Sequence, residues 1–98
     1  MKFAITAAVA VAASHDTVVV AYEDPNRRVS QVALALSTTT GHLFTMGLPV
    51  SGEDVSAFRP AVTVTGNRVA VAWLQAPSGG DDVVMASSHL VARAGRIE

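Results

Sequence analysis

Two short runs of alternating residues, separated by two turn residues, give the clearest signal in this chain. Valine alternates with alanine or threonine over residues 61–65, and Val69, Val71 and Trp73 alternate with two alanines over residues 69–73. Alternation with period two predicts β-strands, because successive side chains point to opposite faces of a sheet. Gly66 and Asn67, which lie between the runs, are typical of a tight turn with positive φ. The pattern therefore predicts a β-hairpin.

Folding this hairpin about its turn separates two kinds of face. The bulky face is predicted to pair Val64 with Val69, Val62 with Val71 and Pro60 with Trp73. The other face carries mostly small residues, namely Thr65, Arg68, Thr63, Ala70, Ala61 and Ala72. Because both faces are almost free of charge, we expect this sheet to be covered on both sides.

An internal repeat extends this interpretation to the rest of the chain. A shift of 51 positions places Val18, Val20 and Tyr22 on Val69, Val71 and Trp73. The same shift also matches another set of residues, placing Val32, Ala35 and Ser37 on Val83, Ala86 and Ser88. Upstream, Ala8–Val11 matches Ala61–Val64 only if the first hairpin loop is two residues longer, a difference that loops tolerate.

Each repeat is predicted to contain four strands and no helix, which makes the fold all-β. The first copy (residues 1–50) is predicted to have strands at 5–12, 17–22, 29–36 and 42–49. The second copy (residues 51–98) is predicted to have strands at 61–65, 68–74, 82–88 and 91–97. Four antiparallel strands that repeat every 40–50 residues are the signature of a β-propeller blade.

Two blades do not close a ring, since propellers typically use about 4–8. An isolated pair would expose two large apolar faces, which soluble monomers rarely do. We therefore expect the chain to form a homo-oligomer in which identical copies complete a ring. A trimer with six blades is favoured over a tetramer with eight, and a segment of a longer propeller is the alternative.

Composition excludes several classes of partner. The 98 residues carry a formal charge of −1, so no basic surface for nucleic acid or for a membrane is expected. The chain has no cysteine, which excludes disulfides and thiolate metal sites. His15, His42 and His89 lack the spacing of a zinc site. No metal and no cofactor are expected.

The N-terminal segment allows two interpretations. Met1 and Lys2 followed by an Ala/Val run to Ala13 resemble a short secretory signal. The repeat instead predicts a strand here, which we favour, and the run is too short to span a bilayer. The compartment, cytoplasmic or secreted, stays open.

One turn carries a family resemblance. Residues 37–44 read Ser-Thr-Thr-Thr-Gly-His-Leu-Phe. They resemble the Asp-box of sialidase-like propellers (bacterial neuraminidase repeats), Ser-x-Asp-x-Gly-x-x-Trp. Ser37, Gly41 and the aromatic Phe44 match, and Thr39 replaces the aspartate. We expect Gly41 at positive φ, Thr39 as a hydrogen-bond acceptor and Phe44 packed beneath the turn.

The resemblance implies a binding end of the ring, at the loops that follow the second and the fourth strand of each blade. Sialidases bind the substrate carboxylate with three arginines and use a tyrosine nucleophile with a glutamate, and an aspartate as acid/base. Phe58-Arg59-Pro60 is similar to the start of one such arginine motif. The candidate ligand-binding residues at this end are Arg59, Tyr22, Glu23, Asp24, Arg27, Arg28 and Asp82.

Each candidate has a plainer alternative. Arg59 binds an anion, repeated around a ring axis, or it lies along the surface and pairs with Glu53 or Asp54. Tyr22 recurs at Trp73, which is typical of packing, and Glu23 points to the opposite side of its strand. Asp24 and Asp82 fit solvated turn carboxylates, without the ligand spacing of a calcium loop.

Three functions remain in competition. A non-catalytic ring that serves as a binding or scaffold surface, with carbohydrate as one candidate ligand, is favoured. A sialidase-like glycosidase is disfavoured, because identical subunits cannot place a unique acid, nucleophile and clamp at one off-axis position. Aromatic scarcity also weighs against a lectin, since sugars usually stack on Trp or Tyr. The third function is a purely structural ring.

Overall fold

The computed structural model describes residues 9–24, 29–39, 41, 43–45, 47–77 and 80–91. They form two antiparallel sheets and contain no helix, so none that could cross a membrane. In chain order the strands are β1 (Val9–Ser14), β2 (Thr17–Asp24), β3 (Gln31–Ser37), β4 (Leu48–Pro49), β5 (Ser56–Thr65), β6 (Arg68–Ala76) and β7 (Val83–Leu90). The predicted all-β fold is confirmed.

The first sheet has the strand order β1-β2-β3-β4, as a simple meander. Its first three strands agree with the predicted segments to within a few residues, although residues 5–8 lie outside the described part of the chain. The fourth is shorter than predicted: β4 contains only Leu48 and Pro49 of the expected 42–49. Before β4 the amide of Thr45 donates to the Leu36 carbonyl at 2.8 Å, and His42 and Met46 lie outside the described residues.

The second sheet has the order β5-β6-β7. Its hairpin has the predicted register, with Val64 opposite Val69 and Val62 opposite Val71. The predicted pairing of Pro60 with Trp73 is wrong, because the register shifts between Phe58 and Ala61. Of the predicted fourth strand, 91–97, the structure describes only Val91, whose amide donates to the Asn67 carbonyl at 2.8 Å.

The two hairpins have loops of the same length, so the prediction of a longer first loop is wrong. Strand β1 continues to Ser14, which pairs with Thr17 across the two residues His15 and Asp16. His15 takes φ 57° and Gly66 takes φ 62° at the same position of the two turns. The alternation of Ala and Val in β1 fits both registers, and only pairing distinguishes them.

A constant shift of 51 relates β1 and β2 to β5 and β6, but β3 and β7 need a shift of 52. Val18 lies opposite Ser37 in the first sheet, and its equivalent Val69 lies opposite His89 in the second. Ser37 therefore corresponds to His89, rather than to Ser88 as the sequence match predicts. A slip of one residue exchanges the two faces of a strand, so this correction decides which β7 residues face outward.

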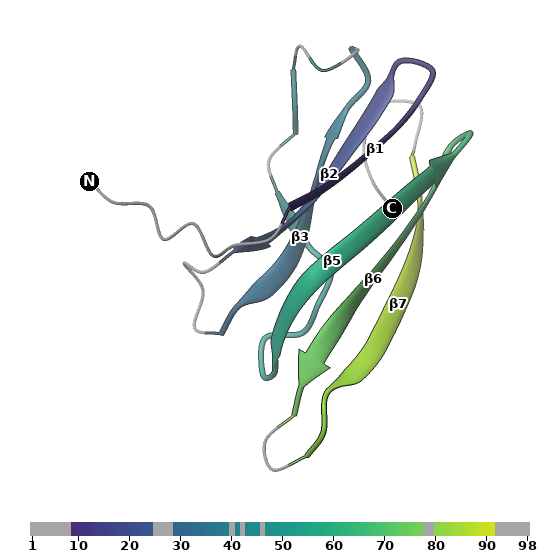
Figure 1. Ribbon diagram of the computed structural model, residues 1–98. Coiled ribbons are helices and arrows are strands. Elements are labelled where there is room, and N and C mark those ends of the chain that lie inside the picture. Colours follow the sequence, from purple (N-terminus) through teal and green to yellow (C-terminus); the bar gives the residue numbers. More distant parts are fainter. Residues whose placement is uncertain are drawn as a thin grey trace.

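The sheets stack face to face, with both hairpin turns at the same end (Figure 1). Strand β5 lies against β1 and β2, so the second sheet covers one face of the first. The buried core between them contains Val19, Ala21, Val32, Leu34, Leu36, Ala57, Val69, Val71 and Trp73. The predicted bulky face of the hairpin is thus the inner face of the second sheet.

Candidate functional site

The end of the molecule opposite the hairpin turns brings together residues far apart in sequence. There β2 ends, β5 begins and the linker between the two sheets passes (Figure 1). The amide of Arg59 donates to the Glu23 carboxylate, with 2.7 Å between nitrogen and Oε2. Two candidate binding residues, Glu23 and Arg59, are therefore in direct contact.

Arg59 takes an unusual backbone conformation in this contact. Its φ is 56°, in the left-handed region that residues with a Cβ rarely adopt. It lies in the irregular stretch of β5 between Phe58 and Ala61, where β5 has one more residue than β6. Such a bulge redirects a side chain, and Arg59 is exposed. Neither the strain nor the bulge has a signal in the sequence.

A buried polar cluster holds the linker between the two sheets, close to the contact of Glu23 with Arg59. The Gln31 side-chain nitrogen donates to the carbonyls of Ser51 and Gly52, at 3.0 and 3.1 Å. The Ser51 hydroxyl accepts the Val32 amide at 2.9 Å. Gln31 and Ser51 are both buried. Sequence reasoning missed this cluster, because a glutamine and a serine 20 positions apart give no motif.

The other candidate ligands that the structure describes are Tyr22, Asp24 and Asp82. Tyr22 precedes Glu23 on β2 and points to the outer face of the first sheet, where its hydroxyl lies over Gly47. A Cβ at position 47 would overlap the Tyr22 hydroxyl, so an alanine there would have to displace the tyrosine ring. Asp24 ends β2, and Asp82 is exposed just before β7. Arg27 and Arg28 lie outside the described residues.

The turn after β3 is held by serine and threonine hydroxyls. The Ser37 Oγ accepts the amides of Thr39 and Gly41, at 3.2 and 2.9 Å, and the Thr39 Oγ1 accepts the Leu43 amide at 2.9 Å. Gly41 has φ 86°. These features are the ones expected of the turn. The expectation that Phe44 packs beneath it is wrong, since Phe44 is 45% exposed.

One polar pair was not foreseen. The Ser87 Oγ and the His89 Nε2 lie 2.8 Å apart on one face of β7. Their spacing of two residues along a strand puts both on one face, which the sequence could have revealed. Within the described residues, no group of three or more His, Cys, Asp or Glu could hold a metal ion.

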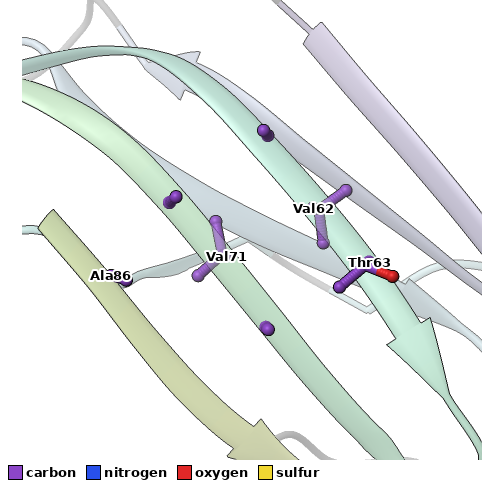
Figure 2. A pocket seen from close by; sticks show the side chains of 7 residues that line it. Val62, Thr63, Val71 and Ala86 are labelled. Carbon is purple, nitrogen blue, oxygen red and sulfur yellow. The ribbon is translucent and has the colours of Figure 1, made fainter. Parts of the chain in front are cut away.

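A shallow, open hollow of ≈ 240 Å³ lies on the second sheet. Figure 2 shows the side chains that line it, which come from three neighbouring strands. They are almost entirely small or apolar: Ala61, Val62, Thr63, Ala70, Val71, Ala72 and Ala86. Such a lining offers almost no polar group to orient a small ligand.

Comparison of the chain with protein-family models, with curated proteins and with solved structures finds no match.

Proposed function

We propose that this chain is a non-catalytic building block that assembles with copies of itself into a closed, propeller-like ring. The observation that carries the proposal is the stacking of two apolar-faced sheets that leaves an apolar face open on each side. Val9 and Val11 are 61% and 62% exposed on the first sheet, and Val84 is 71% exposed on the second. Further sheets stacked in the same manner would remove both faces from water.

The mass in solution tests this proposal. Native mass spectrometry and light scattering are expected to give three times the 10.1 kDa of one chain, independent of concentration over the micromolar range. Four times that mass would indicate a ring of eight blades instead of six. A folded single chain at all concentrations would refute the assembly.

The loop end near Arg59 is the proposed binding surface of the ring. Its exposed guanidinium would recur once per copy, and carboxylate-bearing glycans are the first ligand class to test. A glycan array of the assembled protein is expected to retain acidic glycans, and Arg59→Ala is expected to lose them. Arg59→Lys is the matched control, because it keeps the charge without the fork of donors. An array without hits would favour a plain scaffold.

A sialidase-like hydrolase is the second candidate function, favoured only by an exposed arginine beside a glutamate. Two observations weigh against it. The Glu23 carboxylate is held by the Arg59 amide, and Tyr22 lies on the opposite face of the strand. Turnover of a fluorogenic sialoside that is lost in both Tyr22→Phe and Arg59→Ala would establish the enzyme. Absence of turnover is the expected result.

A further inference from the structure

Within the chain, the inner face of the first sheet packs against the inner face of the second. By the internal repeat, the outer face of each sheet is equivalent to the inner face of the other sheet. Inside, β2 presents Val19 and Ala21 to the second sheet, and β6 presents Val69 and Val71 to the first. The residues 51 positions after Val19 and Ala21 are Ala70 and Ala72, which lie on the outer face of β6. The residues 51 positions before Val69 and Val71 are Val18 and Val20, which lie on the outer face of β2. Each outer face is therefore equivalent to one side of a contact that already exists.

The valine face is the outer face of β1 and β2 and contains Val9, Val11, Val18 and Val20. The hollow face is the outer face of the second sheet and contains Ala61, Thr63, Ala70, Ala72 and Ala86.

We propose that the hollow face of one copy receives the valine face of a second copy, head to tail. This inference rests on the proposed assembly and specifies its contact. The model for the contact is the stacking of β5 on β1 within the chain. In the proposed contact between copies, β5 of one chain occupies the position that β1 has in the internal stacking. Strand β1 of the next chain occupies the position that β5 has there. Val11 then occupies the place that Val62 has in the internal core.

Side-chain size agrees with this pairing. The inner face of β3 carries Leu34 and Leu36, whereas their equivalents on the hollow face, two positions of β7, are Ala86 and Ser88. These smaller residues leave the hollow open (Figure 2). Two hollow faces placed together would enclose empty space, which loses packing contacts. The exposed valines of the other face are larger and can fill the hollow, so a hollow face pairs better with a valine face than with a second hollow face.

Two variants, each blocked at one face by an added charge, test whether the valine face of one copy binds the hollow face of another. Val11→Glu places a charge on the valine face, and Ala70→Glu places one on the hollow face. Both positions are exposed within a single chain, so folding is expected to survive. Each variant alone is expected to have the mass of one chain, 10.1 kDa. An equimolar mixture is expected to form a one-to-one dimer, because each partner keeps the face that the other lacks.

The control is Thr38→Glu, which adds the same charge at an exposed position outside both faces. It is expected to assemble like the wild-type chain. If either glutamate variant does not fold, as judged by Trp73 fluorescence, Val9→Glu or Ala61→Glu replaces it on the same face.

Two outcomes would overturn the inference. If either blocked variant alone forms a dimer, two copies associate through the same face, which contradicts the head-to-tail contact. If the mixture stays at the mass of one chain while the wild-type protein is a closed ring, the ring uses another contact. If the mixture dimerises but the wild-type protein forms open chains of variable mass, the head-to-tail contact stands and ring closure fails.

Discussion

The backbone amide of Arg59 and the carboxylate of Glu23 join the two sheets at their loop end. They are 36 positions apart in sequence, and the nitrogen-to-oxygen distance is 2.7 Å. Glu23 is the last but one residue of β2, and Arg59 occupies the bulge of β5 at φ 56°. A charged acceptor makes this hydrogen bond stronger than a neutral one. The contact holds an arginine in a conformation that it rarely adopts.

Removal of the Glu23 carboxylate is expected to weaken this junction. Glu23→Ala should lower the free energy of unfolding by about 1 kcal/mol, the usual net contribution of one intramolecular hydrogen bond. Glu23→Gln is the matched control, since its amide oxygen still accepts, and a smaller loss is expected. Urea unfolding followed by the fluorescence of Trp73, the only tryptophan, measures both. A midpoint for Glu23→Ala equal to that of the wild type would contradict the prediction.

Replacement of Arg59 by glycine is expected to stabilise the chain. A residue with a Cβ costs roughly 1–2 kcal/mol in the left-handed region, and glycine avoids that cost. Arg59→Gly should therefore unfold at a higher urea concentration than Arg59→Ala, which keeps the strain. Both variants lack the guanidinium, so their difference isolates the backbone. A lower midpoint for the glycine variant would show that the strain is not intrinsic to Arg59.

The same reasoning applies to the first hairpin, with the second as its natural comparison. His15 has φ 57° at the turn position where the second hairpin has Gly66. His15→Gly is expected to raise the free energy of unfolding by about 1 kcal/mol, and Gly66→Ala to lower it by a similar amount. Opposite shifts of the two midpoints would support the equivalence of the turns, and shifts in the same direction would contradict it.

Local pattern was sufficient for the hairpins but not for their relation to one another. The register of β5 and β6 follows from period-two alternation and the Gly66-Asn67 turn, as predicted. The alternating Ala and Val of β1 read equally well in two registers, so the position of its turn was misjudged. The one-residue offset between β3 and β7 comes from loop length, which similarity of Val and Ala residues cannot reveal.

The candidate site was foreseen only in part. Arg59 and Glu23 were singled out by residue type and by their position in the predicted blade, and they are in contact. Their bond, the bulge and the Gln31–Ser51 cluster depend on contacts between distant segments, which no local pattern encodes. Phe44 was expected to be packed because its motif implies it, yet it is 45% exposed.

The buried Gln31 side chain is expected to be essential for the linker. Gln31→Ala leaves the carbonyls of Ser51 and Gly52 without their donor, at a cost of about 1–3 kcal/mol for buried groups. Gln31→Glu is the control of similar size; it replaces the donor by an acceptor facing two carbonyls, and a greater loss is expected. Urea unfolding measures both. A tolerated Gln31→Glu would contradict the assignment of the side-chain nitrogen as the donor.

Tyr22 and Gly47 are expected to be coupled. A Cβ at position 47 overlaps the Tyr22 hydroxyl, so Gly47→Ala should displace the ring and lower the free energy of unfolding by roughly 1 kcal/mol or more. In a Tyr22→Phe background the hydroxyl is absent, and the same substitution should cost less. A double-mutant cycle from urea unfolding gives the coupling energy, which contacting residues place at about 0.5–3 kcal/mol.

Gly52→Ala is the control for this cycle, because a Cβ at Gly52 would have no neighbour within 4 Å. It is expected to change the free energy of unfolding equally in the wild-type and Tyr22→Phe backgrounds, which removes any general effect of an added methyl group. If Gly47→Ala is equally costly with and without the Tyr22 hydroxyl, the tyrosine does not occupy the space above Gly47.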